Sequence, residues 1–159
     1  MTATPTATDF PPTPAAMPHR RGGVRRALRR AWRECLVPID AGDTAAIAAV
    51  RGVARSALAW WGVPGERSSD VLLALSELAT NALVHTTGPV RVRLTCRSRT
   101  IRMDIADASP GVPQPMAPGL AADAPHGWGL TIAETLADRL TVTTVDTGAG
   151  KIVTAEFDF

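Results

Sequence analysis

Apolar residues follow two different periods along this chain, and the change from one to the other predicts the order of its helices and strands. Helical spacing runs through residues 44–61 and from about 68 to 85. Apolar and polar residues then alternate over 90–97 and 101–106, which is typical of two half-buried strands joined by a turn at 98–99. Helical spacing returns over 131–139, and the remaining strands are predicted at 33–38, 140–147 and 151–159.

Turn and cap residues set the expected limits of the first two helices. The segment from Asp40 to Asp43 can cap the helix at 44–61. Glycine and proline residues at 62–65 would stop that helix, and the Ser-Ser-Asp run at 68–70 would cap the next. The order of elements predicts an α+β fold, a two-layer sandwich in which helices cover one face of a mainly antiparallel sheet.

The second helical segment carries a stripe of polar side chains. Glu77, Asn81 and His85 fall at roughly 0°, 40° and 80° on a helical wheel, apart from the apolar arc of the same helix. Leu73 and Val84 are expected to flank the stripe and to make its surroundings partly apolar. A solvated helix face is the ordinary explanation of such a stripe, so a chemical role depends on partners elsewhere in the chain.

Two glycine-bearing segments downstream could be those partners. Asp107 ends a predicted strand, where it can accept a hydrogen bond from an amino group, and Gly111 would let a ring approach the backbone. The segment 127–130, Gly-Trp-Gly-Leu, opens a helix, where free N–H groups and the helix dipole favour an anion. Neither the dinucleotide fingerprint nor the Gly-Lys-Ser/Thr phosphate loop is present.

Taken in order, the three segments resemble the nucleotide site of the GHKL superfamily, which contains gyrase, chaperone ATPases, histidine kinases and mismatch-repair ATPases. The likeness runs from about Glu34 to Phe159. Within that superfamily the chain is similar to the stand-alone anti-sigma-factor serine/threonine kinases of high-GC bacteria. Two sequence motifs carry this narrower likeness. They are Ser76-Glu77-Leu78-x-Thr80-Asn81-Ala82-x-x-His85, and Gly150-Lys151 before the last strand.

The resemblance implies a Bergerat-type ATP-binding fold and a role for each matched residue. Asp107 would accept from the adenine amino group, and Asn81 would hold Mg²⁺. Glu77 would be the catalytic base. The expected ATP-binding set is completed by Gly111, Gly127, Gly129 and Leu130. His85 is expected to cap its helix, and Lys151 is expected to be a turn residue.

The same likeness implies partners as well as ligands. An anti-sigma kinase would phosphorylate a STAS-type anti-anti-sigma protein and capture a sigma factor, with a homodimer expected by analogy. Related kinases often carry an arginine near the last glycine box, where this chain has Pro125, His126 and Trp128, and Ser109 replaces a usual glycine. A non-catalytic ATP-dependent binding module is therefore an alternative. A histidine-kinase catalytic domain acting in trans is a weaker one, because no heptad-bearing dimerisation helix with a histidine is visible.

Composition adds the expected limits of the domain. Residues 1–30 are rich in proline, threonine and arginine and are expected to form a flexible tail before an ATPase domain at 31–159. The seven arginines at 20–33 are expected to be solvated, so no direct contact with nucleic acid is predicted. No apolar run reaches the length of a membrane span, and a cytoplasmic protein is expected. The two cysteines, Cys35 and Cys96, are expected to be buried reduced thiols.

Overall fold

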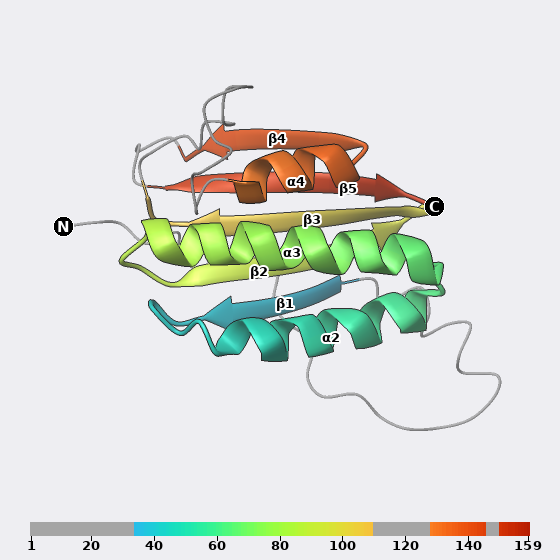
Figure 1. Cartoon of the computed structure of the whole chain (residues 1–159), viewed down its shortest axis with the longest axis horizontal. Helices are drawn as coiled ribbons and strands as arrows, with labels where there is room; N and C mark the ends of the chain where they lie inside the picture. Colours follow the sequence, from blue (N-terminus) through green and yellow to red (C-terminus); the bar gives the residue numbers. More distant parts are fainter. Residues whose placement is uncertain (1–33, 110–127, 146–149) are drawn as a thin grey trace.

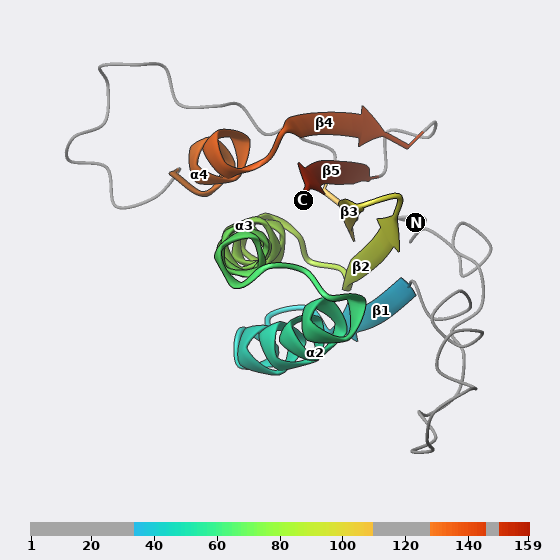
Figure 2. The same cartoon turned by 90° about the vertical axis from the view of Figure 1, so that its right-hand side faces the viewer.

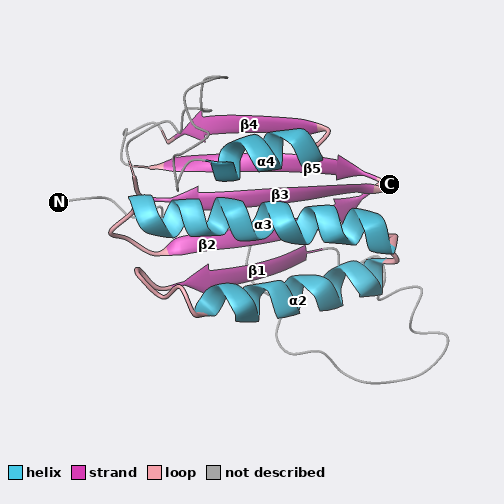
Figure 3. Ribbon diagram, in the orientation of Figure 1, coloured by secondary structure: helices cyan, strands magenta, loops and turns pink. Residues whose placement is uncertain are grey.

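The computed structural model describes residues 34–109, 128–145 and 150–159, which form a five-stranded sheet covered on one face by three helices (Figures 1 and 3). In chain order the elements are β1 (Glu34–Ile39), α2 (Ala46–Trp61), α3 (Gly65–His85), β2 (Val90–Arg97), β3 (Thr100–Asp107), α4 (Trp128–Leu136), β4 (Arg139–Thr144) and β5 (Lys151–Asp158). Neighbouring strands pair antiparallel in the order β1-β2-β3-β5-β4.

The predicted α+β sandwich is confirmed, since all three described helices lie on the same side of the sheet (Figure 2). The expected tail at 1–30 and the expected start of the domain at 31 lie outside the described residues. Among the helices that the structure describes, none has the length and apolar character needed to cross a membrane.

Local chemistry explains where the first two helices begin. The helix expected from residue 44 begins at Ala46, with Ala45 as its N-cap residue and no capping side chain on it. Asp43 of the expected capping segment still accepts from the N–H of Ala46 at 3.1 Å, through Oδ1.

Helix α3 starts at Gly65, directly after Pro64, and not at the Ser-Ser-Asp run, so that expected cap was wrong. Pro64 is the N-cap residue, with an extended ψ of 147°, and its carbonyl accepts the first helical bond, from the N–H of Ser68 at 2.8 Å. The helix thus begins without a capping side chain. Ser69 instead donates back to the carbonyl of Gly65 at 3.0 Å.

The turn between β2 and β3 is tight and has an unusual backbone. Ser98 and Arg99 both have positive φ, at 49° and 68°. Two successive residues of this kind form the turn whose twist matches a two-residue hairpin. The predicted turn at 98–99 is therefore confirmed, although neither of its residues is glycine.

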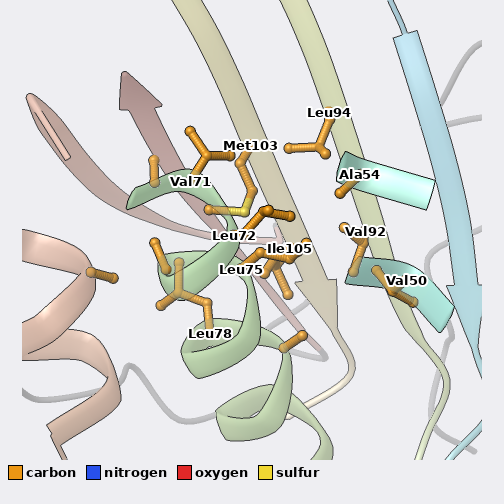
Figure 4. Close-up of a cluster of buried hydrophobic side chains, with 14 of the residues drawn as sticks. Val50, Ala54, Val71, Leu72, Leu75, Leu78, Val92, Leu94, Met103 and Ile105 are labelled. Atoms are coloured by element: carbon orange, nitrogen blue, oxygen red, sulfur yellow. The ribbon is translucent and has the colours of Figure 1, made fainter. Parts of the chain in front are cut away.

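The hydrophobic core lies between the inner face of the sheet and the helices (Figure 4). Alternate residues of β2 and β3 point into it, because successive side chains of a strand face opposite sides. Helix α3 lies over the middle of the sheet and contributes half of its circumference to the core. The labelled members of this core are Val50, Ala54, Val71, Leu72, Leu75, Leu78, Val92, Leu94, Met103 and Ile105.

Ion pairs cover the opposite face of the sheet. Arg102 Nε lies 2.9 Å from Asp104 Oδ1, and the hydroxyl of Thr154 donates to the same carboxylate at 2.7 Å. Arg93 pairs with Glu34 at 2.7 Å. Asp104 and Glu34 thus balance part of the positive charge of this face.

Both cysteines are free thiols, as expected, but their burial differs. Cys96 is buried and Cys35 is only partly buried. Burial, with a smaller contribution from the Glu34 carboxylate, raises the pKa of Cys35. The Cys35 thiol therefore stays protonated and poorly nucleophilic at neutral pH.

Arg67 joins three elements at one end of the molecule. From the start of α3, it donates to the carbonyl of Leu136 at 3.0 Å and to that of Asp158 at 2.8 Å, and it pairs with Asp138. Its guanidinium lies 5.4 Å from the centroid of the Phe157 ring. These contacts tie the end of α4 and the end of β5 to α3.

The carboxylate of Asp138 strengthens this junction. A hydrogen bond from the backbone N–H of Asp158, helped by the Arg67 guanidinium, lowers the pKa of Asp138. A lowered folded-state pKa means that Asp138 adds stability above its unfolded pKa, and this is lost as the pH falls through the folded value. Because the carboxylate is half exposed, the contribution is modest.

We predict that Arg67→Met lowers the free energy of unfolding by about 2 kcal/mol or more at neutral pH. Methionine keeps much of the stem that packs beside Phe157 but leaves the Leu136 and Asp158 carbonyls without their donor. Urea denaturation measures the loss. The control is Arg55→Met on the exposed side of α2, which should change stability by less than about 0.5 kcal/mol. Equal effects of the two substitutions would contradict the role of Arg67.

Candidate functional site

Four segments that are separate in the sequence come close together toward one end of the sheet. The end of α3 lies beside the end of β3, since a Cβ on Gly88 would stand 3.1 Å from that of Ala108. The start of β5 pairs with the end of β3, with Asp107 opposite Lys151. The N-terminal turn of α4 lies against the middle of α3, at Glu77. In Figure 1 the ends of α3 and β3 and the start of β5 lie on the left of the molecule, and α4 begins closer to its middle.

Helix α4 runs antiparallel along α3. At its C-terminal end the carbonyl of Leu136 bonds to Arg67, and at its N-terminal end Gly129 packs against Glu77. A Cβ on Gly129 would lie 3.3 Å from both the carbonyl oxygen and the carboxylate Oε2 of Glu77, so glycine permits this close approach. Helix α4 therefore covers α3 from Arg67 to Glu77 and presents its positive end there.

The polar stripe of α3 continues beyond the N-terminus of α4. Glu77 and Asn81 are half-buried, and His85 is exposed in the last helical turn. That position suits the predicted capping role of His85, because a basic group is favoured at a helix C-terminus. Leu73 and Val84 are 46% and 63% exposed, so within the described part of the chain nothing closes the stripe on their side. The enclosure of the stripe comes from α4 on its other side.

Asp107 is the most deeply buried member of the site, with 1% of its surface exposed. Its Oδ1 accepts from the backbone N–H of Ser109 at 2.8 Å and from Lys151 Nζ at 2.9 Å. Lys151 also donates to the hydroxyl oxygen of Ser109. Asp107 Oδ2 is buried and has no hydrogen-bond partner among the described residues. An acceptor in this state is costly unless a donor, such as a ligand amino group, reaches it.

The expectation that Lys151 is a turn residue was wrong. Lys151 is the first residue of β5, it is 4% exposed, and it forms a buried ion pair with Asp107. Its contact with Asp107 depends on the register of β5 against β3. The role of Ser109 was missed for the same reason, because its hydroxyl meets Lys151 only in the folded chain. That Lys151 is the only lysine of the chain was the one signal in the sequence.

Gly150 makes the Asp107–Lys151 contact sterically possible. A Cβ at this position would lie 2.7 Å from the carbonyl oxygen of Asp107, closer than real side chains come. The atom that it would meet belongs to the backbone and cannot turn aside. Glycine therefore lets β5 begin directly beside the end of β3.

The other residues expected at the site fall into two groups. Gly111 and Gly127 lie outside the described residues. The side chain of Leu130 is buried in the core, so its backbone alone remains available to a ligand. Thr131 was not predicted, yet its Oγ1 is buried in the first turn of α4 and has no partner among the described residues. Within that part of the chain no cluster of three metal-ligating side chains exists, so Mg²⁺ would depend on Asn81 and ligand oxygens.

Comparison with known proteins identifies the family and a similar fold. Residues 41–157 match the family of the histidine kinase-like ATPase domain, and the chain belongs to that family. A chain in the crystal structure of the SiaB-SiaC complex from Pseudomonas aeruginosa has a similar fold, with a TM-score of 0.60 at 12% identity. That match covers 84% of this chain and 95% of the other. No curated protein sequence matches the chain.

The family implies that ATP, usually with Mg²⁺, is the ligand, and three features fit it. Asp107 Oδ2 is a buried acceptor in need of a donor. The first turn of α4 presents N–H groups that lack intrahelical partners, which suits phosphate oxygens. Asn81 follows Glu77 by one turn on α3 and carries the kind of oxygen that Mg²⁺ binds.

We predict that Gly150→Ala lowers the free energy of unfolding by about 1–3 kcal/mol, because the new methyl group must displace backbone at Asp107. Thermal and urea unfolding measure the change. Gly52→Ala is the matched control, since a Cβ there meets nothing within 4 Å inside a helix. That control should raise stability by about 0.5–1 kcal/mol. Two changes of the same sign would contradict the close approach at residue 150.

Proposed function

We propose that this protein is an ATP-binding regulator that phosphorylates a serine or threonine of a STAS-type anti-anti-sigma protein. The observation that carries the proposal is the N-terminal turn of α4 beside the carboxylate of Glu77, one helical turn before Asn81 on α3. The proposed anion site, base and Mg²⁺ ligand would thus lie on two helices that are in contact. The membership of the histidine kinase-like ATPase family supports the choice of ATP.

Asp107 and Asn81 would bind and orient the nucleotide. Asp107 Oδ2 accepts from an exocyclic amino group, which favours adenine over guanine because guanine has a carbonyl oxygen at that position. Asn81 would supply its side-chain oxygen to Mg²⁺, and water and phosphate oxygens would complete the coordination that this ion prefers. Gly127 and Gly129 would donate backbone N–H groups to the phosphates.

Glu77 would move the proton. Its half-buried carboxylate lies at the positive end of α4, where it can orient an incoming hydroxyl and accept the hydroxyl proton. Bound Mg-ATP would supply the phosphoryl group that the hydroxyl oxygen receives. Since the catalytic contribution of Glu77 is to the proton, its loss should spare nucleotide binding.

A protein partner is part of the proposal. The solved structure with the similar fold is described as a complex of two proteins, which supports partner binding as a use of this fold. For this chain we propose a STAS-type partner and a sigma factor, in the cytoplasm, with a homodimer as the working unit. The control of transcription would follow from the phosphorylation of the STAS-type partner.

One observation favours a second candidate function. Between Arg102 and Arg139 the sequence contains neither arginine nor lysine, so this stretch offers no such cation to a terminal phosphate beside α4. Binding of ATP would tolerate that more easily than phosphoryl transfer, whose transition state needs charge stabilisation. The alternative is therefore a binding module that uses ATP to set its shape for a partner.

We predict that Glu77→Gln leaves the Kd for Mg-ATP within about threefold of the native value but lowers phosphoryl transfer by about a hundredfold or more. Glutamine keeps the shape of the side chain and removes the base. The assay measures calorimetric binding together with transfer from radiolabelled Mg-ATP to a panel of STAS-type proteins from the same organism.

Glu134→Gln is the matched control for that experiment, because Glu134 is an exposed glutamate on α4. It should change neither binding nor transfer. Phosphoryl transfer by Glu77→Gln at the native rate would contradict the proposed role of Glu77 as the base. Tight binding by the native protein without transfer to any STAS-type protein would favour the binding module.

A further inference from the structure

We propose that Lys151 is a positioning residue that sets the base specificity of the site by fixing which oxygen of Asp107 meets the ligand. This inference rests on the proposed binding of ATP. The observation behind it is an asymmetry within one buried carboxylate. Asp107 Oδ1 accepts two hydrogen bonds, whereas Oδ2 accepts none from the described residues.

The two donors at Oδ1 fix the orientation of the carboxylate. The Ser109 N–H comes from the chain just beyond β3, and the Lys151 ammonium comes from β5. Donors from two segments prevent the carboxylate from turning about its own axis without breaking a bond. The bond from Lys151 to the Ser109 hydroxyl closes a three-residue cluster, so the ammonium itself is held in place.

Burial makes this arrangement selective. Lys151 and Asp107 are 4% and 1% exposed, so water cannot readily replace either partner. The ammonium compensates the buried negative charge, which would otherwise be very unfavourable. What remains is a single acceptor, Oδ2. A ligand with an amino group satisfies it, while a ligand with a carbonyl oxygen at the same place meets a like partial charge.

The position of Lys151 is specific to this contact. Strand register sets Lys151 opposite Asp107, and Gly150 allows the two chains to approach. Three residues farther along β5, Thr154 makes the analogous bond from the same strand to Asp104. Thr154 therefore provides a control that is buried and polar like Lys151 but touches a different aspartate.

The test compares ATP with purine riboside triphosphate, which lacks only the 6-amino group. Calorimetry gives the ratio of the two Kd values for the native protein and for Lys151→Met. We expect the native protein to prefer ATP by about tenfold or more, the worth of one hydrogen bond to a charged group. In Lys151→Met this preference should fall to about twofold, because the carboxylate is no longer held.

If Lys151 had only a structural role, Lys151→Met would weaken the binding of both nucleotides equally and leave the ratio of their Kd values unchanged. Thr154→Val should show this structural behaviour. Its free energy of unfolding should be lower, and its ratio of Kd values for the two nucleotides should equal that of the native protein. An unchanged ratio in Lys151→Met overturns the inference while the proposed function stands. A native protein that binds neither nucleotide overturns the proposed function, and the inference with it.

Ser109→Ala decides the matter if Lys151→Met does not fold. This variant keeps the ion pair and the backbone N–H, and it removes the second acceptor of the Lys151 ammonium. The preference for ATP should then fall by about threefold, because the ammonium is held less firmly. A native ratio in Ser109→Ala would overturn the inference.

Discussion

Helix α4 packs antiparallel on α3 and is held at both of its ends, and the geometry of the candidate site follows from that contact. Arg67 bonds the last carbonyl of α4, and Gly129 lets the first turn touch Glu77. Between these two contacts the direction and the reach of α4 along α3 are set. The N-terminus of α4, which is the positive end of its dipole, therefore lies at Glu77, one turn before Asn81 in the same polar stripe of α3.

Strand pairing in the sheet forms the other half of the candidate site, independently of the contact between α3 and α4. Antiparallel pairing brings the last residue of β3 beside the first residue of β5, and Gly150 removes the side chain that would keep them apart. Asp107 and Lys151 meet there as a buried ion pair, and the other carboxylate oxygen of Asp107 has no partner among the residues that the structure describes. In the function that we propose, recognition of a base and recognition of phosphates would thus depend on different contacts, one between strands and one between helices.

The fold could be largely predicted from periodicity, because the core makes strands alternate and helices repeat. The start of α3 was placed too late, since proline can begin a helix without a capping side chain. Glu77, Asn81 and Asp107 could be singled out because each lies in a short motif. Lys151, Ser109 and Thr131 could not, because their contacts or their burial depend on register and helix packing, which no local pattern encodes.

The most direct test of the account is a calorimetric titration of the protein with Mg-ATP, with Asn81→Ala and Asp107→Ala measured in parallel. One residue belongs to the helix side of the site and the other to the sheet side, so a single nucleotide should need both. The account predicts saturable binding that each substitution weakens by about tenfold or more. No binding by the native protein would contradict a single ATP site formed by the two sides. A Kd for Mg-ATP that either substitution leaves unchanged would contradict it as well.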